Sequence, residues 1–301
     1  MEQEYHIPVL LKESVDGLAI KPNGIYVDLT FGGGGHSREI LSRLDDGKLI
    51  VFDQDADAYA NRPDDDRLIF VRHNFRYLTH FLRYIGVEKV DGILGDLGVS
   101  SHHFNEADRG FSFRFDGKLD MRMSQQLQKT AADVVNTYDE SELKRLFWQY
   151  GEIKQSGKLA GQIVKRRSAN LFETTTDLKE VAENCGPKKE QSKFLAQVFQ
   201  ALRIEVNQEM DVLKAVLNAS VDAIAVGGRL SVISYHSLED RLVKNFIRSG
   251  SCDKANAEQD IYGQTNVPFK AVNRKIIVPT DEEIEVNGRA RSAKLRIAER
   301  V

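Results

Sequence analysis

Four consecutive glycines, Gly32–Gly35, follow directly on an apolar run of the chain. The run Ile25–Thr30 is expected to form a buried strand, and Ser37–Leu44 is expected to form a helix. Glycines at such a junction let the backbone approach a ligand closely, and the helix start offers N–H groups at the positive end of its dipole. This junction therefore predicts an α/β fold that binds a nucleotide-like ligand after its first strand.

The rest of the first hundred residues repeats this alternation of strand and helix. Short apolar runs occur at 49–52, 68–71 and 92–94, with helical segments at 56–61 and 78–85 between them, and a further strand is expected at 229–234. Near-continuous apolar strands separated by helices indicate a parallel sheet covered on both faces. The segments 275–278 and 293–298 are expected to pair as closing strands. We therefore predict a Rossmann-like α/β sheet, mostly parallel, with an antiparallel closing strand.

The middle of the chain has a different pattern. Asp139 and Glu142 form a capping box that should start a helix ending at Gly151, and further helices are expected at 153–167, after a cap at Thr176, and from 192 to 217. No strand pattern interrupts them. We therefore predict an inserted all-helical domain at 124–193, assigned to substrate recognition. The cofactor-binding α/β core is expected at 1–123 and 194–301.

Composition excludes several classes of protein. The chain has no run of 18 apolar residues, and its acidic start does not resemble a signal peptide. Its two cysteines fit no metal-ligand spacing, and the pair His102-His103 has no further spaced ligand. We expect a cytoplasmic protein without a structural metal. The net charge of −3 gives no global argument for nucleic acid, although local basic patches remain candidates.

The spacing of the glycines discriminates between two cofactors. A dinucleotide fingerprint requires glycines in the pattern G-x-G-x-x-G. Counted from Gly32 the third glycine position is Ser37, and counted from Gly33 it is Arg38. The NAD pattern is therefore broken, which favours S-adenosylmethionine. An NAD-linked oxidoreductase on the same fold stays as an alternative.

Two residues after the next strands are candidates for binding the rest of the cofactor. Asp53 ends the second strand, where an acid commonly accepts hydrogen bonds from ribose hydroxyls. Its alternative role is a helix cap. Phe75 follows the third strand and is a candidate for packing against an adenine, with a place in the core as the alternative.

Two further residues are candidates for the reaction itself. Asp96 ends the fourth strand and His236 follows the fifth, so both should lie at the sheet edge that carries the glycine loop. Transfer to an amine requires acceptors for the N–H protons and a base that takes one of them. We therefore predict Asp96 and His236 as catalytic, with structural roles as the alternatives.

With these residues placed, the chain resembles the family of ribosomal RNA small-subunit methyltransferase H. The motifs that carry the resemblance are His6–Glu13, Asp28–Ser37, Asp91–Ser101, Arg109–Phe113, Leu119–Met123, Gln200–Asn207, Ser234–Asp240 and Arg289–Arg296. They run nearly from end to end of the chain. The resemblance implies N4-methylation of a cytidine in the decoding region of small-subunit (16S) rRNA, with S-adenosylmethionine as cofactor.

The family's cofactor contacts can be carried over to matching positions. The resemblance implies contacts at Gly34, Gly35, His36, Asp53, Phe75 and Asp96. A further contact, usually a glutamine, falls on His103, which can still donate a hydrogen bond.

Basic residues are candidates for holding the phosphates of small-subunit rRNA or of the assembled subunit. They are Arg109, Arg122, Lys165, Arg166, Arg167, Arg289 and Arg291. A solvated surface is the alternative for each patch. A homodimer remains open beside a monomer. A non-catalytic RNA-binding assembly factor remains the rival from another functional class.

Overall fold

The computed structural model describes residues 8–99, 106–252 and 267–301. Contacts within the chain divide it into two units, residues 1–98 with 210–301 and residues 99–209. The first unit is a sheet covered by helices, and the second is a group of helices. None of the helices in the described ranges is long and apolar enough to cross a membrane.

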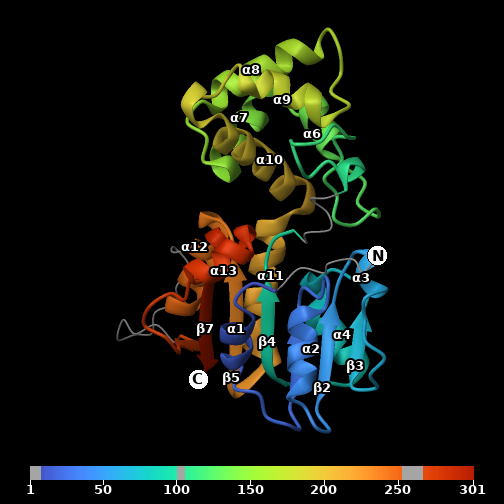
Figure 1. Cartoon of the computed structure of the whole chain (residues 1–301), viewed down its shortest axis with the longest axis vertical. Helices are drawn as coiled ribbons and strands as arrows, with labels where there is room; N and C mark the ends of the chain where they lie inside the picture. Colours follow the sequence, from blue (N-terminus) through green and yellow to red (C-terminus); the bar gives the residue numbers. More distant parts are fainter. Residues whose placement is uncertain (1–7, 100–105, 253–266) are drawn as a thin grey trace, which may run out of the picture. The chain divides into compact units, whose positions relative to one another are not determined.

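A seven-stranded sheet organises the first unit (Figure 1). Its order is β3-β2-β1-β4-β5-β7-β6, and the five strands from β3 to β5 are parallel. Strand β7 runs antiparallel to both of its neighbours. The strands are β1 (Ile25–Asp28), β2 (Lys48–Phe52), β3 (Leu68–Val71), β4 (Val90–Asp96), β5 (Ile224–Ser234), β6 (Phe269–Ala271) and β7 (Lys294–Arg300). The predicted fold class is confirmed.

Helices cover both faces of this sheet. Successive strand residues point to opposite faces, and both sets of side chains are apolar and packed against helices. Tyr26 and Val51 lie in a core with α1 and α2, whereas Val27 and Ile50 lie in a second core with α4, α11 and α12. The helices of this unit are α1 (Leu11–Asp16), α2 (Gly35–Ser42), α3 (Ala56–Tyr59), α4 (Leu78–Ile85), α11 (Glu209–Ala223), α12 (Ser237–Ser249) and α13 (Asp281–Val286), with short 3₁₀ turns η1 (Phe75–Tyr77) and η5 (Gly288–Ser292).

The closing strands differ from the prediction. Strand β7 lies where it was expected. Its second partner, beside β5, is β6 and not the predicted strand 275–278. Of that segment only Ile277 pairs with β7, through one bridge to Leu295. The side-chain amide of Asn273 donates to the carbonyl of Lys275 and turns the chain just before this segment. The following Pro279 has no N–H to extend a ladder.

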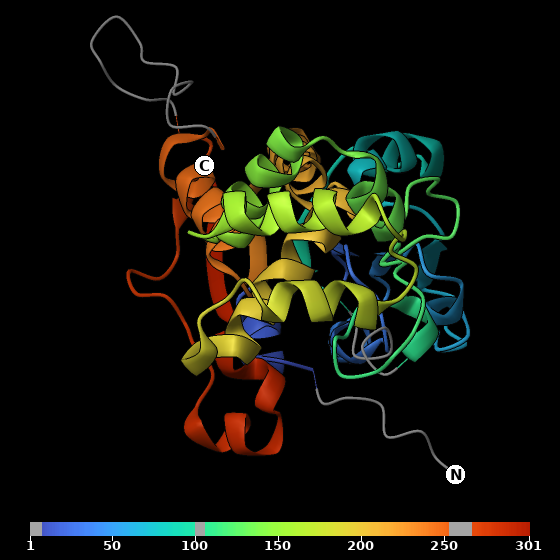
Figure 2. The same ribbon diagram turned by 90° about the horizontal axis from the view of Figure 1, so that it is seen from above.

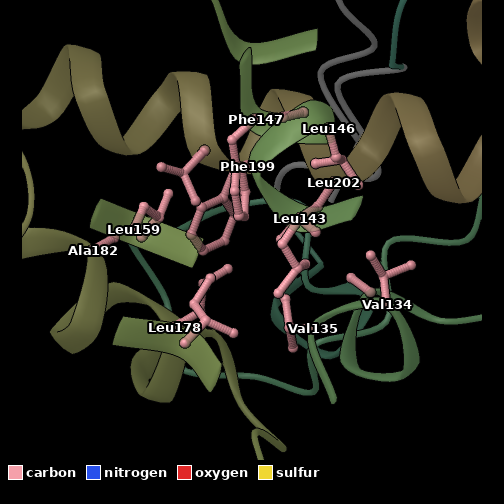
Figure 3. Close-up of a cluster of buried hydrophobic side chains, with 14 of the residues drawn as sticks. Val134, Val135, Leu143, Leu146, Phe147, Leu159, Leu178, Ala182, Phe199 and Leu202 are labelled. Atoms are coloured by element: carbon pink, nitrogen blue, oxygen red, sulfur yellow. The ribbon is translucent and has the colours of Figure 1, made fainter. Parts of the chain in front are cut away.

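The second unit is helical (Figure 2), and it has its own apolar core (Figure 3). Val135, Phe147, Leu178 and Phe199 converge in it from four different helices (Figure 3). The elements are η2 (Ala107–Arg109), α6 (Ala131–Thr137), α7 (Glu140–Gly151), α8 (Ser156–Arg167), α9 (Thr175–Glu183), η3 (Lys188–Glu190) and α10 (Gln191–Asn207).

Side chains cap these helices as local chemistry requires. The predicted capping box of Asp139 and Glu142 starts α7. The cap of α9 is Thr174, paired with Asp177, and the predicted cap at Thr176 is wrong. The Asp177 carboxylate accepts from the N–H of Thr174, and the Thr174 hydroxyl accepts from the N–H of Asp177. These two hydrogen bonds fix the start of the helix.

The helical unit is wider than the predicted domain at 124–193. Its core includes Phe111, Leu119 and Met121, which precede the predicted start, and the whole of α10 follows in it up to Asn207. The side chain of Asn207 fastens the two ends together, since its amide donates to the carbonyl of Met121 and its oxygen accepts from the N–H of Met123. The described residues 106–123 and 194–209 therefore belong with the helices and not with the sheet.

Candidate active site

The carboxyl ends of β1, β2, β4 and β5 share one edge of the sheet, because these strands are parallel. Strand order reverses between β1 and β4, since the chain continues from β1 to β2 on one side and returns to β4 on the other. Ligands of open α/β sheets bind at such a switch point. The N–H of Asp96 donates to Thr30 Oγ1 at 2.8 Å and ties the two loops of this crevice together.

The glycine loop takes a backbone conformation that other residues rarely adopt. Gly32 and Gly34 have φ angles of +52° and +77°, and Gly34 caps α2. A Cβ at Gly34 would lie 2.7 Å from the ring of Phe31, and one at Gly35 would overlap the ring of Pro8. Glycine is therefore needed here, and it leaves the first N–H groups of α2 open to a ligand.

A buried carboxylate lies beneath this loop. Asp28 accepts hydrogen bonds from Ser37 Oγ at 2.6 Å and from the N–H of Thr30 at 3.0 Å. Burial raises the pKa of Asp28, while His36 and these hydrogen bonds oppose that shift. Asp28 fixes the loop against the start of α2, a role that reasoning from the sequence did not assign to it.

Asp53 lies beside the glycine loop, as predicted. Its Oδ2 accepts from the N–H of Gly32 and its Oδ1 from the N–H of Asp55, both at 2.8 Å. The cap of α3 is Asp55 and not Asp53, which removes the alternative role. The carboxylate therefore joins the end of β2 to the glycine loop, and its contact with a ribose stays a prediction.

Among the predicted site residues, Asp96 has the pKa that departs most from its ordinary value. Its Oδ1 accepts from the hydroxyl of Tyr235 at 2.7 Å, and its Oδ2 lies 3.9 Å from His36 Nδ1. The side chain is 23% exposed. Burial raises the pKa of Asp96 to about 6, although His36 and Tyr235 act in the opposite direction. Such a carboxyl group changes charge close to neutral pH, as acid–base catalysis requires.

The other predicted cofactor contacts are His36, Phe75 and His103. His36 is buried, and its Nε2 lies 3.1 Å from the carbonyl oxygen of Val9, which leaves Nδ1 facing Asp96. Phe75 starts η1 after β3 and is partly buried against the core of α4 and α11. Both predicted roles of Phe75 are therefore compatible with its position. His103 lies outside the described residues.

His236 occupies a helix-capping position. It is the N-cap of α12, and Glu239 completes a capping box with it. Its Nε2 lies 3.1 Å from Glu239 Oε1, and Glu239 Oε2 accepts from the N–H of Tyr235 at 2.9 Å. Nδ1 of the ring caps its own helix, so a structural role is present, whereas Nε2 is buried and makes no hydrogen bond among the described residues.

The predicted RNA-binding residues separate into two groups. Four arginines donate hydrogen bonds to backbone carbonyls of their own unit. Arg109 donates to the carbonyls of Arg122 and Met123, and Arg122 donates to the carbonyl of Leu127. Arg166 donates to the carbonyl of Leu171, and Arg167 donates to the carbonyls of Val135 and Tyr138. Arg122 and Arg166 also pair with Asp120 and Asp177. The side chains of Lys165, Arg289 and Arg291 are exposed. A guanidinium has five donors, so engagement of the first group does not exclude a phosphate contact.

Reasoning from the sequence did not single out Tyr235, whose hydroxyl donates to Asp96 Oδ1. It precedes His236 in the motif Ser234–Asp240 at the end of β5. Its position directly after a strand of the reactive edge was the available signal.

These features together define a class of protein. The sheet order with one reversed strand, the glycine loop after β1, and the acids after β2 and β4 are those of a Rossmann-like methyltransferase that uses S-adenosylmethionine. A family model described as the MraW methylase family matches residues 3–301, and the chain belongs to this family.

Curated relatives cover almost the whole chain. The chain is 60% identical over 300 residues to "Ribosomal RNA small subunit methyltransferase H" of Phocaeicola vulgatus, covering 99% of this chain and 98% of the relative. The protein of the same name from Parabacteroides distasonis is 59% identical over 299 residues, with the same coverage. The predicted family resemblance is confirmed.

The residues at the edge of the sheet fit S-adenosylmethionine. The cofactor carries cationic sulfonium and ammonium groups, and Asp53 and Asp96 provide carboxylates at the crevice. A Cβ at Gly34 would overlap the Phe31 ring, so glycine is required for the conformation of the loop beside these carboxylates. The predicted cofactor therefore agrees with both the family and the local chemistry.

Proposed function

We propose that this chain methylates the N4 amine of a cytidine in the decoding region of small-subunit ribosomal RNA. The observation that carries the proposal is the perturbed carboxylate of Asp96 at the switch point of a chain related over nearly its whole length to small-subunit rRNA methyltransferases. A cytoplasmic location accompanies the proposal, since ribosomal subunits are its substrate.

Residues of the first unit would hold the cofactor. Gly34, Gly35 and the start of α2 offer backbone N–H groups, Asp53 offers oxygens to ribose hydroxyls, and Phe75 offers an aromatic edge to an adenine. When bound, S-adenosylmethionine supplies a methyl group whose bond to a positively charged sulfur breaks with the electron pair remaining on sulfur.

Asp96 has a defined task in such a reaction. An exocyclic amine of cytosine has a lone pair delocalised into the ring, and an acceptor for its N–H protons helps to free that pair. The nitrogen gains a carbon bond and must release one proton. Asp96, with a pKa near 6, is ionised at neutral pH and can accept that proton. His236 stays the second candidate for this role.

The helical unit is proposed to contact the RNA. Lys165 is exposed on α8, and Trp148 is 66% exposed on α7 with the exposed Lys144 and Arg145 one turn before it. An exposed aromatic ring among cations suits a nucleic acid, because bases stack on the ring while phosphates meet the charges. Arg289 and Arg291 add exposed cations on the first unit.

The test is methyl transfer to small subunits from a strain that lacks this gene. Subunits and protein-free rRNA are incubated with labelled S-adenosylmethionine and the purified chain, and the product is mapped by mass spectrometry of rRNA fragments. We expect one additional methyl group on a cytidine amine of the decoding region. Cofactor binding without labelling of either substrate would instead favour a non-catalytic assembly factor. Binding of NAD in place of S-adenosylmethionine in calorimetry would favour an oxidoreductase.

A further inference from the structure

Tyr235 reaches from the end of β5 across to the end of β4. The two strands pair with Ile233 beside Asp96, and the N–H of Leu97 donates to the carbonyl of Ile233. Two residues further on, the Tyr235 hydroxyl donates to Asp96 Oδ1 at 2.7 Å. Its ring also lies against Gly98, where a Cβ would be 3.4 Å from Tyr235 Cδ2. The Tyr235 side chain is thus positioned both by its hydrogen bond to Asp96 and by the packing of its ring against Gly98.

The hydroxyl of Tyr235 can act only as a neutral donor near neutral pH. Burial raises its pKa, and the neighbouring carboxylates of Asp96 and Glu239 raise it further. The proton therefore stays on the phenol and points to Asp96 Oδ1. A phenylalanine would keep the ring but remove this donor.

Four titratable groups influence Asp96 from different elements. Burial is the largest influence and raises its pKa. His36 on α2 and the Tyr235 hydroxyl lower the pKa, whereas Asp28 on β1 and Glu239 on α12 raise it. Since Tyr235 occupies Oδ1, the second oxygen, Oδ2, is the one turned toward His36 at 3.9 Å.

We propose that Tyr235 is a positioning residue for methyl transfer, whose hydroxyl fixes Asp96 Oδ1 so that Oδ2 accepts an N–H of the acceptor amine. This inference rests on the proposed function. A carboxylate held at one oxygen loses rotational freedom before the substrate arrives, so the other oxygen is oriented in advance. The nitrogen gains its methyl group, and its released proton passes to Oδ2.

The test compares Tyr235→Phe with the wild type in a pH–rate profile of methyl transfer to small subunits. Loss of a hydrogen bond to a carboxylate should move the acid limb upward by about one pH unit. The plateau rate should also fall several-fold, because Asp96 is less well oriented. A role of Tyr235 in stability alone would lower the melting temperature and leave the acid limb in place.

Tyr26→Phe is the matched control. The Tyr26 hydroxyl is also buried and bonded, but it accepts from the N–H of Lys21 before β1 and not from the reactive edge. This variant should keep the wild-type acid limb. Site-specific 3-fluorotyrosine at position 235, a more acidic phenol and a stronger donor, should move the acid limb downward, and it remains informative if Tyr235→Phe does not fold.

A readout independent of activity separates this inference from the proposed function. Carbon NMR of labelled aspartate carboxyls, with the Asp96 signal assigned through Asp96→Asn, reports the pKa of Asp96 directly. If the pKa of Asp96 is higher in Tyr235→Phe but the wild type does not methylate subunits, the influence of Tyr235 on Asp96 is supported and the proposed methylation of rRNA is rejected. An active wild type whose acid limb and Asp96 pKa are both unchanged in Tyr235→Phe would overturn the inference.

Discussion

One set of charged side chains in each unit has opposite effects on stability. In the helical unit, arginines such as Arg166 and Arg167 donate to backbone carbonyls and hold the ends of helices in place. In the sheet unit, the carboxylates Asp28 and Asp96 converge at one edge, where burial raises the pKa of each. The first arrangement stabilises its unit, whereas burial of the two carboxylates costs stability. Under the proposed function, that cost accompanies a carboxylate, Asp96, that can accept a proton near neutral pH.

The largest expected effect is that of Asp96→Asn, which should lower methyl transfer by at least about 100-fold. The variant should also melt at a higher temperature than the wild type at pH 7.5. Because the folded pKa is raised to about 6, ionised Asp96 opposes folding above that pH, by up to about 3 kcal/mol. This cost disappears as the pH falls from about 6 toward the ordinary value near 4. The melting temperatures should therefore converge there.

Asp91→Asn is the control for this prediction, since Asp91 lies on the same strand at its other end. Burial alone would raise the pKa of Asp91, but hydrogen bonds from Lys21 and the N–H of Ile25 lower it overall. Asp91→Asn should therefore lose stability at neutral pH and keep its activity. Equal losses of activity in the two variants would contradict the contrast between reactive and stabilising carboxylates.

Gly34→Ala should weaken S-adenosylmethionine binding at least about tenfold, as measured by calorimetry. The left-handed backbone conformation costs a residue other than glycine about 1–2 kcal/mol, and the new Cβ would overlap the Phe31 ring. Gly86→Ala provides the control. Gly86, at the end of α4, also has a positive φ, of +80°, but no atom of the described residues lies within 4 Å of the place where its Cβ would stand. It should lower the melting temperature and leave the affinity for the cofactor unchanged. Unaltered affinity in Gly34→Ala would remove the loop from the cofactor site.

Arg167→Ala and Lys165→Ala test the role assigned to the helical unit's charges. Arg167→Ala loses two bonds, to the carbonyls of Val135 and Tyr138, and should destabilise the chain by about 2 kcal/mol in urea unfolding. Lys165→Ala should change stability by less than about 0.5 kcal/mol. If Lys165 meets a phosphate, the salt dependence of RNA binding should lose about one counterion. The opposite pattern would assign Arg167 to RNA and Lys165 to the fold.

The smallest expected effect separates capping from catalysis at His236. Asparagine is a good N-cap, so His236→Asn should keep α12 intact while it removes the imidazole. A capping role predicts methyl transfer within about twofold of wild type for His236→Asn and a loss of about 1 kcal/mol of stability for His236→Ala. Equal, large losses of transfer in both variants would identify His236 as a catalytic residue.

The sheet and its reactive edge could be predicted from the sequence because both follow from strand direction. The apolar runs that became β1 to β3 located the strands, and parallel strands necessarily place Asp53 and Asp96 at the edge that carries Gly34. The helical unit was harder to bound, because Phe111, Leu119 and Met121 join its core from segments without helical periodicity. The partner of Asp96 was missed for a similar reason, since the reach of Tyr235 depends on side-chain direction beyond the end of a strand.

The place of the helical unit in the chain also has a consequence for biosynthesis. Strand β4 is made before this unit and its neighbour β5 after it, and residues 97–223, 127 residues, lie between the two strands. At ~5–20 residues per second, a ribosome needs on the order of ten seconds to synthesise that interval. During this time the edge of β4 that later pairs with β5 has no partner from its own sheet. The glycine loop and Asp96 are thus already synthesised long before Tyr235 emerges, and the last parallel strand of the sheet, β5, also delivers the hydroxyl that donates to Asp96.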